Sequence, residues 1–303
     1  MHNQDQIFTT IPLQGYDTLY LTTANPLFEN DFLKKSCQTI ILKLDQYNLK
    51  QAGHILKRKM FYISKKDLPL EVGEIYKHSA SISNSIDQSI LKDILISEPE
   101  FLNDFQSKAY EYGARRFFCW CHKDPVVEKI FINSGLIFCG EFPDLDKTVL
   151  RFYKDIDCPK ACKIDITVSE NEICESYEEL NPYCSDNIHD FFGIFIRDAQ
   201  ESDTIKGGIF GKIQVTNKGL VHAVILCLWV DDSIVKTGLG KVLMMHTEVL
   251  LKNHGVTCLE LATDGFQAPG FYKKMGFELV ESCPGYYLLN NGPSSIFDCT
   301  KKI

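Results

Sequence analysis

Residues 235–241 have the residue types of a phosphate-binding loop. Two glycines, Gly238 and Gly240, open a predicted helix after an apolar strand and a short loop. A helix N-terminus preceded by glycines offers free backbone N–H groups and the positive end of the helix dipole, which together hold a phosphate or pyrophosphate. Lys236 and Lys241 add positive charge beside it. Alone, the pattern is weak evidence, because glycines before a helix are also ordinary turn residues.

The elements that would position this loop alternate between strand and helix from residue 162 onward. Apolar residues at period two predict strands over residues 162–168, 191–199, 207–215, 219–230 and 256–263. Helical spacing predicts helices over residues 169–180, 238–255 and 269–276, and short strands over residues 277–282 and 285–289 close the sheet. This order is typical of an α/β layer built on a mixed sheet.

The first half repeats the end of this pattern. Residues 112–142 and 254–283 both run from a glycine through an apolar strand, a polar turn and an aromatic-bearing helix to a second glycine and a strand. The glycine pairs are Gly113 with Gly135 and Gly255 with Gly276, so their spacings are 22 and 21 residues. One insertion aligns the copies, which indicates an internal duplication. We expect the domain boundary between residues 156 and 157, where the apolar pattern lapses.

The second half resembles the Gcn5-related N-acetyltransferase (GNAT) family over residues 163–289. The resemblance rests on "TGLG" at the helix start, then "CLELAT", then "FQAPGFYKKMGF". It implies a twisted mixed sheet flanked by helices, with acetyl-coenzyme A (acetyl-CoA) lying across a V-shaped split between the fourth and fifth strands. The family's pyrophosphate loop, Q/R-x-x-G-x-G/A, falls on Val235, Lys236, Thr237, Gly238, Leu239 and Gly240, followed by Lys241. Val235 departs from the usual Gln or Arg. Because backbone amides hold the phosphate, we expect this departure to affect affinity more than function.

The same resemblance implies that Tyr272 points at the sulfur of the bound thioester and acts as the general acid. A phenol of pKa about 10 can donate to the developing thiolate of a thiol of pKa about 8.5 without ionising beforehand. The alternative is that "FYKKMGF" is an aromatic helix face that only packs on the sheet. That alternative is our expectation for Phe271 and Phe277.

An amine acceptor must lose a proton before it attacks, so a general base is useful. Glu260 stands in an apolar strand, twelve residues before Tyr272, and peptide-acetylating members of the family place a glutamate at this spacing. The equal alternative is a glutamate on the solvent face of the strand. His222 is left unassigned, because a lone histidine is more often a structural residue.

The family resemblance also assigns backbone roles within residues 225–230. There Leu228 and Val230 would pair with the pantetheine arm of the cofactor like an added strand, and an amide would polarise the acetyl oxygen. Asp231 and Asp232, just beyond, could instead bind a cationic acceptor.

The first half lacks this chemistry. Counting back from the last glycine of each copy aligns Tyr272 with Phe131, so the acid is absent. The glycine loop is expected within residues 94–105, a stretch without glycine that carries Glu98 and Glu100, which would repel a phosphate.

The composition restricts the partners. The net charge of −8 argues against nucleic acid, and no run of about 18 apolar residues predicts a membrane span. Twelve scattered cysteines and the lack of a signal-peptide pattern indicate free thiols in a reducing compartment, so a cytoplasmic protein. No metal is expected, because Cys158 and Cys162 have no second pair at ligand spacing. Tandem GNAT proteins of this length include VipF-like effectors that intracellular bacteria deliver into host cells, and the resemblance extends to them.

We therefore expect an N-acetyltransferase with two tandem GNAT-like domains. Residues 157–303 would move an acetyl group from acetyl-CoA to an amine on a protein, peptide or small molecule, by direct attack in a ternary complex. Residues 1–156 would form a degenerate domain that shapes the acceptor cleft or binds a protein partner. Two alternatives stay open: transfer of another acyl or aminoacyl group, and a binding protein that keeps the fold without turnover.

Overall fold

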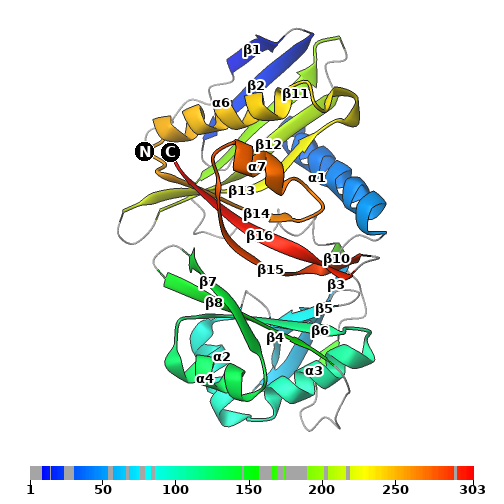
Figure 1. Cartoon of the computed structure of the whole chain (residues 1–303), viewed down its shortest axis with the longest axis vertical. Helices are drawn as coiled ribbons and strands as arrows, with labels where there is room; N and C mark the ends of the chain where they lie inside the picture. Colours follow the sequence, from blue (N-terminus) through cyan, green and yellow to red (C-terminus); the bar gives the residue numbers. More distant parts are fainter. Residues whose placement is uncertain are drawn as a thin grey trace. The chain divides into compact units, whose positions relative to one another are not determined.

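The computed structural model describes residues 9–13, 15–23, 31–53, 57–65, 68–75, 79–82, 86–144, 147–156, 166–168, 173–174, 190–200, 204–215, 219–289 and 292–303 (Figure 1). The chain divides into two compact units. Unit 1 comprises Met1–His54, Ser176–Val280 and Ile296–Ile303, and unit 2 comprises Ile55–Glu175 and Glu281–Ser295. Each unit therefore combines stretches that are far apart in the sequence.

Unit 1 is built on a mixed sheet with the strand order β1-β2-β11-β12-β13-β14-β16-β15. The strands are β1 (Thr9–Leu13), β2 (Tyr16–Thr23), β11 (Asp190–Asp198), β12 (Ile205–Val215), β13 (Val221–Val230), β14 (Cys258–Asp264), β15 (Glu278–Leu289) and β16 (Gly292–Lys302). The helices are α1 (Asp31–Ala52), α6 (Leu239–Asn253) and the short α7 (Pro269–Lys274). Among the strand pairs described, β13 with β14 is parallel and the others in this sheet are antiparallel.

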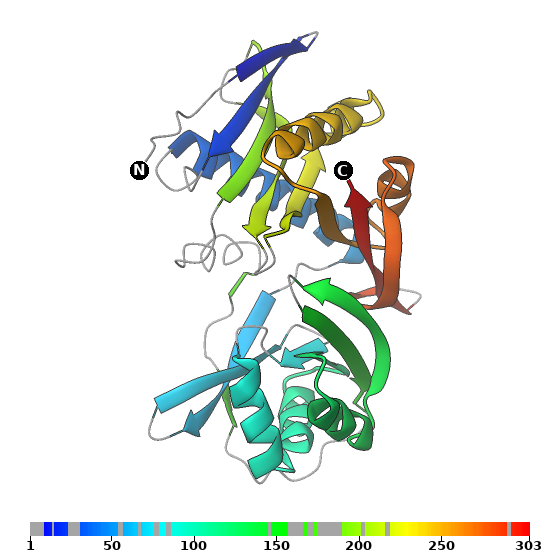
Figure 2. The same ribbon diagram turned by 90° about the vertical axis from the view of Figure 1, so that its left-hand side faces the viewer.

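Helices cover both faces of this sheet, as Figures 1 and 2 show. On one face, Leu243 and Met244 of α6 join an apolar cluster with the sheet, and on the other Ile40 and neighbouring residues of α1 do the same. Gly208 on β12 lets α1 approach closely, because an added Cβ would lie 2.3 Å from Ile40 Cδ1. Residues near the N-terminus therefore complete the core of the unit that contains most of the second half.

Unit 2 repeats the arrangement with the strand order β10-β3-β4-β5-β6-β8-β7, and β9 also pairs with β3. The strands are β3 (Lys57–Lys65), β4 (Leu68–Ile75), β5 (Ser79–Ile82), β6 (Arg116–His122), β7 (Ile137–Asp144), β8 (Lys147–Asp155), β9 (Ile166–Val168) and β10 (Ile173–Cys174). The helices are α2 (Gln88–Ser97), α3 (Phe101–Glu111) and α4 (Pro125–Asn133). The parallel pair β5–β6 corresponds to β13–β14, and β6-β8-β7 corresponds to β14-β16-β15. The expected fold class, two GNAT-like mixed α/β units, is confirmed.

The two halves of the sequence exchange their first strands. β2 from the first half pairs with β11 of the second, while β9 and β10 from the second half pair with β3 of the first. The expected boundary between residues 156 and 157 therefore does not coincide with the division between the units. A sequence pattern identifies strands but not their partners, and here each leading strand pairs with a distant one.

Two local predictions also need correction. The helix predicted over residues 169–180 is wrong at Ile173 and Cys174, which pair with Arg58 and Lys57 as strand β10; the rest of that range lies outside the described residues. The last strand, β16, was not predicted, and it inserts between β14 and β15. The predicted strands that became β11, β12, β13 and β14, and the helices α6 and α7, are confirmed.

Candidate functional site

A V-shaped split opens between β13 and β14. These parallel strands pair only at His222–Val224 with Cys258–Glu260, and within the described residues they share no further pairs. The register of β13 also shifts against β12 at Phe210/Gly211, which marks a bulge around Leu226. Leu228 and Val230, the predicted cofactor-binding positions, lie beyond the last paired residue, on the part of β13 that borders the split.

The loop before α6 has the backbone geometry of an anion site. Gly238 is the N-cap of α6 with φ 90°, and no side chain caps this helix or places an acid in its first turn. Lys236 has φ 69°, and among the described residues it is the one non-glycine with positive φ. Such a strained, left-handed backbone turns successive N–H groups to one side. The N–H groups of the first helical turn have no partner within the helix, so this N-terminus is suited to pyrophosphate.

The other predicted loop residues fall into two groups. The side chains of Val235, Lys236, Thr237 and Lys241 are exposed, so both lysines can reach a bound phosphate from solvent. Thr237 instead turns its hydroxyl back to donate to Ile234 O at 2.6 Å. Asp231 accepts hydrogen bonds from Ser233, which lower the pKa of its carboxyl and commit it to capping this turn.

Strand, loop and short helix converge at Gly240. A Cβ built there would lie 3.7 Å from both Val230 Cγ2 and the Phe271 ring. Phe271 is the first neighbour of Tyr272 on α7, and their rings meet edge to face with centroids 5.3 Å apart. The structure therefore brings the loop, the split strand β13 and the helix that carries Tyr272 to one place.

Tyr272 is buried, with 7% of its surface exposed, and belongs to the core cluster on the α6 face. Burial raises the pKa of Tyr272 well above its ordinary value, and the nearby thiols of Cys227 and Cys299 raise it further. Those thiols come from β13 and β16, so the phenol lies next to strands on both sides of β14. A phenol in this environment keeps its proton at neutral pH, which is the state that a proton donor requires.

Glu260 lies at the last paired position before the split opens, on the other face of β14. Leu259 and Leu261 are buried with Tyr272, and strand alternation places Glu260 opposite them. Its carboxylate is 3.2 Å from His222 Nδ1, and both side chains are mostly buried. Neither of the two expectations for Glu260 included His222 as a partner. The two residues are 38 apart in the sequence, and the pairing of β13 with β14 brings them together.

Helix α1 supports the loop that leads into α7. The Gln267 side chain accepts from the Asp264 N–H at 3.1 Å and donates to Asn48 Oδ1 at 3.0 Å. Tyr47 also donates its hydroxyl to Phe266 O at 3.1 Å. The sequence analysis missed these contacts. The pattern that could have indicated them is Asn48, a polar residue on the helix face that is otherwise apolar at Cys37, Ile40, Ile41 and Leu44.

Unit 2 contains the same local construction. Lys301 on β16 pairs with Leu259 on β14, and Lys154 on β8 pairs with Phe117 on β6. Each lysine ammonium donates to the carbonyl of the residue just before the glycine that ends the short helix, at 2.6 Å in unit 1 and 2.9 Å in unit 2. These matched lysines establish which residues correspond in the two units.

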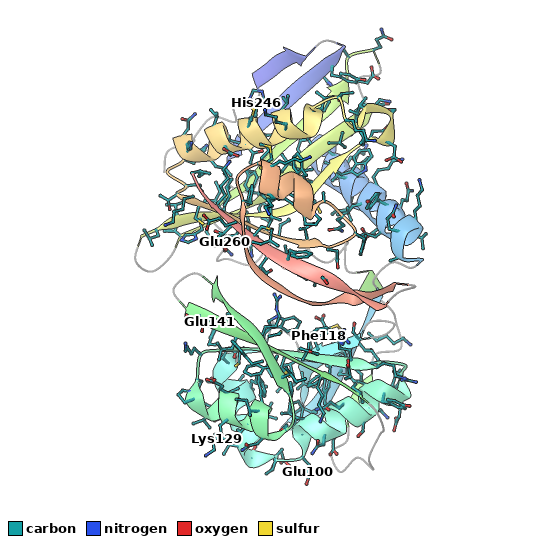
Figure 3. The ribbon with its side chains drawn as sticks, viewed as in Figure 1. Glu100, Phe118, Lys129, Glu141, His246 and Glu260 are labelled. Carbon is teal, nitrogen blue, oxygen red and sulfur yellow. The ribbon has the colours of Figure 1, made fainter. Side chains whose placement is uncertain are left out.

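The correspondence shows what unit 2 lacks. In the order unit 1 then unit 2, the matched residues are Tyr272 and Phe131, Glu260 and Phe118, His222 and Ser79, and Cys258 and Arg116. The helix ends agree with this pairing, because Phe277 N donates to Tyr272 O and Leu136 N donates to Phe131 O, each at 3.1 Å. Figure 3 labels Glu260 and its counterpart Phe118.

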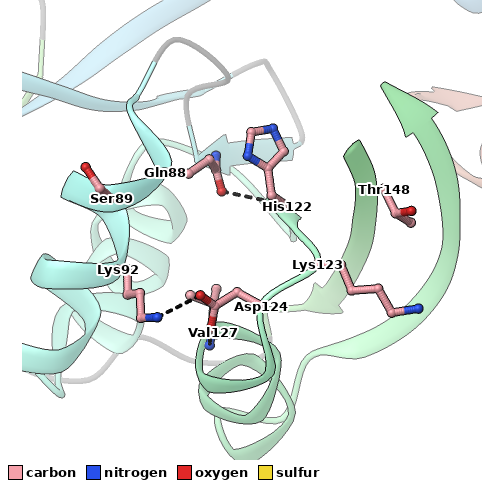
Figure 4. Close-up of a pocket in the computed structure, with 8 residues that line it drawn as sticks. All are labelled: Gln88, Ser89, Lys92, His122, Lys123, Asp124, Val127 and Thr148. Atoms are coloured by element: carbon pink, nitrogen blue, oxygen red, sulfur yellow. Dashed lines mark hydrogen bonds and ion pairs between the residues drawn. The ribbon is translucent and has the colours of Figure 1, made fainter. Parts of the chain in front are cut away.

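The counterpart of the glycine loop is not where the sequence suggested. Helix α2, which follows β5, corresponds to α6, so its N-terminus is the equivalent site and residues 94–105 are not. Asp87 caps that N-terminus by accepting from Ser89 N and Ile90 N. Beside it lies a pocket of about 540 Å³ at the end of β6 and the start of α4 (Figure 4). There Gln88 accepts from His122 N at 3.2 Å and Lys92 forms an ion pair with Asp124.

Residues 161–277 match the acetyltransferase (GNAT) family. The matched residues include the loop before α6, β14 and α7, whereas α1 and β2, which complete the same unit, lie outside the match. Among the described residues, no helix is long and apolar enough to span a membrane.

A curated protein is also similar to part of the chain. The chain is 33% identical over 87 residues to a blasticidin-S acetyltransferase from Streptomyces morookaense, across 28% of this chain and 60% of that protein. The match thus spans less than two thirds of the length of this relative.

Solved structures are similar to part of the chain. The ribosomal-protein-S18-alanine N-acetyltransferase from Escherichia coli matches with 19% identity and a TM-score of 0.33, over 42% of this chain and 76% of that one. Arabidopsis thaliana NAA60 in complex with a bisubstrate analogue matches with 20% identity and a TM-score of 0.35, over 43% and 84%.

Proposed function

We propose that unit 1 transfers an acetyl group from acetyl-CoA to an amine by direct attack in a ternary complex. The observation that carries this proposal is the convergence at Gly240. An uncapped helix N-terminus, the part of β13 that is not paired with β14 and the Tyr272 helix meet there. Because these are the groups that a pyrophosphate, a pantetheine arm and a thiolate leaving group each require, acyl transfer from a coenzyme A thioester fits the site best.

The roles of the residues follow from their places. The backbone of Gly238 to Lys241 would hold the pyrophosphate, and that of Leu228 and Val230 would pair with the pantetheine arm. Tyr272 would give its proton to the sulfur as the carbon–sulfur bond breaks. Glu260, at the opening of the split, would accept the proton that the amine loses as it bonds to the acetyl carbon. The acceptor is an amine on a peptide, protein or small molecule, and unit 2 would contribute a partner surface without catalysing transfer.

Acetyl-CoA titrated into the full chain by calorimetry tests the cofactor site. Gly238→Asp is the informative variant, because it copies the Asp87 cap of unit 2 and places a carboxylate where the phosphate would lie. We expect one binding site in the parent chain and loss of about 100-fold or more in affinity in Gly238→Asp. Gly238→Asn is the matched control, since Asn has the same size and also tolerates a left-handed backbone.

The control should bind far better than the charged variant. Equal affinity in all three proteins would show that acetyl-CoA does not use this helix N-terminus. An absence of binding in the parent chain would overturn the acetyltransferase and favour a binding protein.

A further inference from the structure

A second cluster of side chains lies beside the split, on the face of the sheet that carries Glu260. The atoms His222 Nδ1, Cys258 Sγ and a Glu260 carboxylate oxygen all lie within 4.8 Å of one another. His222 and Cys258 are paired directly across β13 and β14, and Glu260 follows two residues later on the same face. Regular strands therefore hold the cluster in place.

The distances fit one tetrahedral ion. Zinc bonds of about 2.0–2.1 Å to nitrogen or oxygen and about 2.3 Å to sulfur place nitrogen about 3.3 Å from oxygen, and sulfur about 3.6 Å from oxygen. The observed separations from Glu260 Oε1 are 3.2 Å to His222 Nδ1 and 4.0 Å to Cys258 Sγ. Both lie within about 0.5 Å of the tetrahedral values. The third separation, between His222 Nδ1 and Cys258 Sγ, is no more than 4.8 Å, so side-chain rotation would close the site.

The ligand chemistry also favours zinc. A thiolate and a carboxylate supply two negative charges, which a divalent cation neutralises, and imidazole supplies a neutral third donor. Sulfur and nitrogen donors select against Mg²⁺ and Ca²⁺, which prefer oxygen. The side chains of His222 and Glu260 are 17% and 23% exposed, so an ion can enter and a water can complete the coordination. Thr300 Oγ1, 3.1 Å from Cys258 Sγ, can donate a hydrogen bond to the bound thiolate.

We propose that His222, Cys258 and Glu260 form a Zn²⁺ site and that zinc bound there inhibits acetyl transfer. Inhibition follows because Glu260 cannot both bind the ion and accept a proton from the amine. The binding part stands by itself, whereas the inhibition rests on the proposed function. The sequence predicted no metal because ligand spacing was sought along the chain, and these ligands meet through strand pairing.

Metal titration of the full chain tests the site. We expect the Zn²⁺ stoichiometry measured by calorimetry to fall by one ion in both Cys258→Ser and His222→Ala, and the cobalt–thiolate absorption seen with Co²⁺ to weaken in Cys258→Ser. Cys139→Ser is the matched control, because Cys139 is a half-buried strand thiol in unit 2 that donates to the Arg151 carbonyl. Stoichiometry unchanged in both ligand variants, each verified as folded by its melting curve, would overturn the site.

Turnover tests the inhibition separately. Zinc should lower the acetylation rate of the parent chain, and a chelator should restore that rate. The variant Cys258→Ser should need at least about tenfold more zinc for the same loss of rate. Zinc that binds at the cluster without slowing turnover would overturn the inhibitory part. A parent chain without turnover would refute the proposed function, and the metal titration would still decide whether the site exists.

Discussion

In unit 1 and in unit 2, a strand leads into a short helix that ends at a glycine with positive φ, Gly276 in one and Gly135 in the other. In both, a lysine donates to the carbonyl before that glycine, from β16 in unit 1 and from β8 in unit 2. The side chains that could do chemistry differ completely, since unit 1 has Tyr272 and Glu260 where unit 2 has Phe131 and Phe118. The backbone construction is thus independent of the chemistry.

The two helix N-termini beside the parallel strands show the same contrast. In unit 1 Gly238 leaves the start of α6 uncapped, whereas in unit 2 Asp87 occupies the start of α2. A carboxylate there satisfies the helix and repels a second anion, so the change stabilises the fold at the expense of phosphate binding. This contrast supports the proposal that unit 2 does not catalyse acetyl transfer.

The largest expected effect tests which residues complete unit 1. Ile40 on α1 is fully buried against the sheet, so Ile40→Asp places a charge in an apolar core and should cost more than about 4 kcal/mol. We expect loss of the calorimetric unfolding transition that acetyl-CoA stabilises, while the other transition remains. Leu42→Asp, at a position 42% exposed on the same helix, should leave both transitions intact.

Loss of the other unfolding transition would contradict the assignment of α1 to unit 1. If Ile40→Asp removed the transition that does not respond to acetyl-CoA, residues 1–156 would form the first unit after all.

The next prediction tests whether the hydroxyl of Tyr272 accounts for a difference in activity between the two units. Tyr272→Phe copies Phe131 and should lower kcat by about 10²- to 10⁴-fold, because it removes the proposed proton donor and leaves the ring packing. The affinity for acetyl-CoA should stay unchanged in the same calorimetric assay. Phe131→Tyr is the reciprocal variant, and it should gain no activity because Asp87 still blocks α2. Retained turnover in Tyr272→Phe would make the tyrosine a packing residue only.

The helices and strands around the candidate site were predicted well, because the sequence patterns that indicate them are local. Glycines at helix ends, period-two strands and the aromatic helix each depend on neighbouring residues, so residues 190–289 were assigned nearly as the structure has them. The exchange of β2 and β9 was not predictable, since strand pairing depends on which exposed edge each strand meets. The His222–Glu260 contact was missed for the same reason.

A smaller effect tests the support that α1 gives to the Tyr272 helix. Asn48→Ala removes the acceptor of the Gln267 amide, so the loop before α7 loses one contact at a buried position. We expect kcat to fall by about tenfold with little change in KM for acetyl-CoA, because orientation of the acid suffers and cofactor binding does not. Gln51→Ala, at an exposed position on the same helix, is the control. Equal falls in both variants would indicate a general loss of helix stability.

The smallest expected effect comes from replacing Lys154 and Lys301, the two lysines that occupy matching positions in the two units. Lys154→Met removes one charged hydrogen bond to a helix-end carbonyl and should cost about 1–2 kcal/mol in the free energy of unfolding of unit 2. Lys301 makes the same bond and also an ion pair of 2.6 Å with the mostly buried Glu248. Lys301→Met should therefore cost about 1 kcal/mol more in unit 1, since it leaves that carboxylate without its described partner.

Chemical denaturation of the two variants, with acetyl-CoA present to mark the transition of unit 1, measures both costs. The variant Glu248→Gln separates the two contributions, because it keeps the lysine-to-carbonyl bond and neutralises the carboxylate. Lys301→Met in that background should cost no more than Lys154→Met does in unit 2. If the cost in unit 1 stays larger there, the lysines are not equivalent, and the correspondence that matches Tyr272 with Phe131 would rest on the helix ends alone.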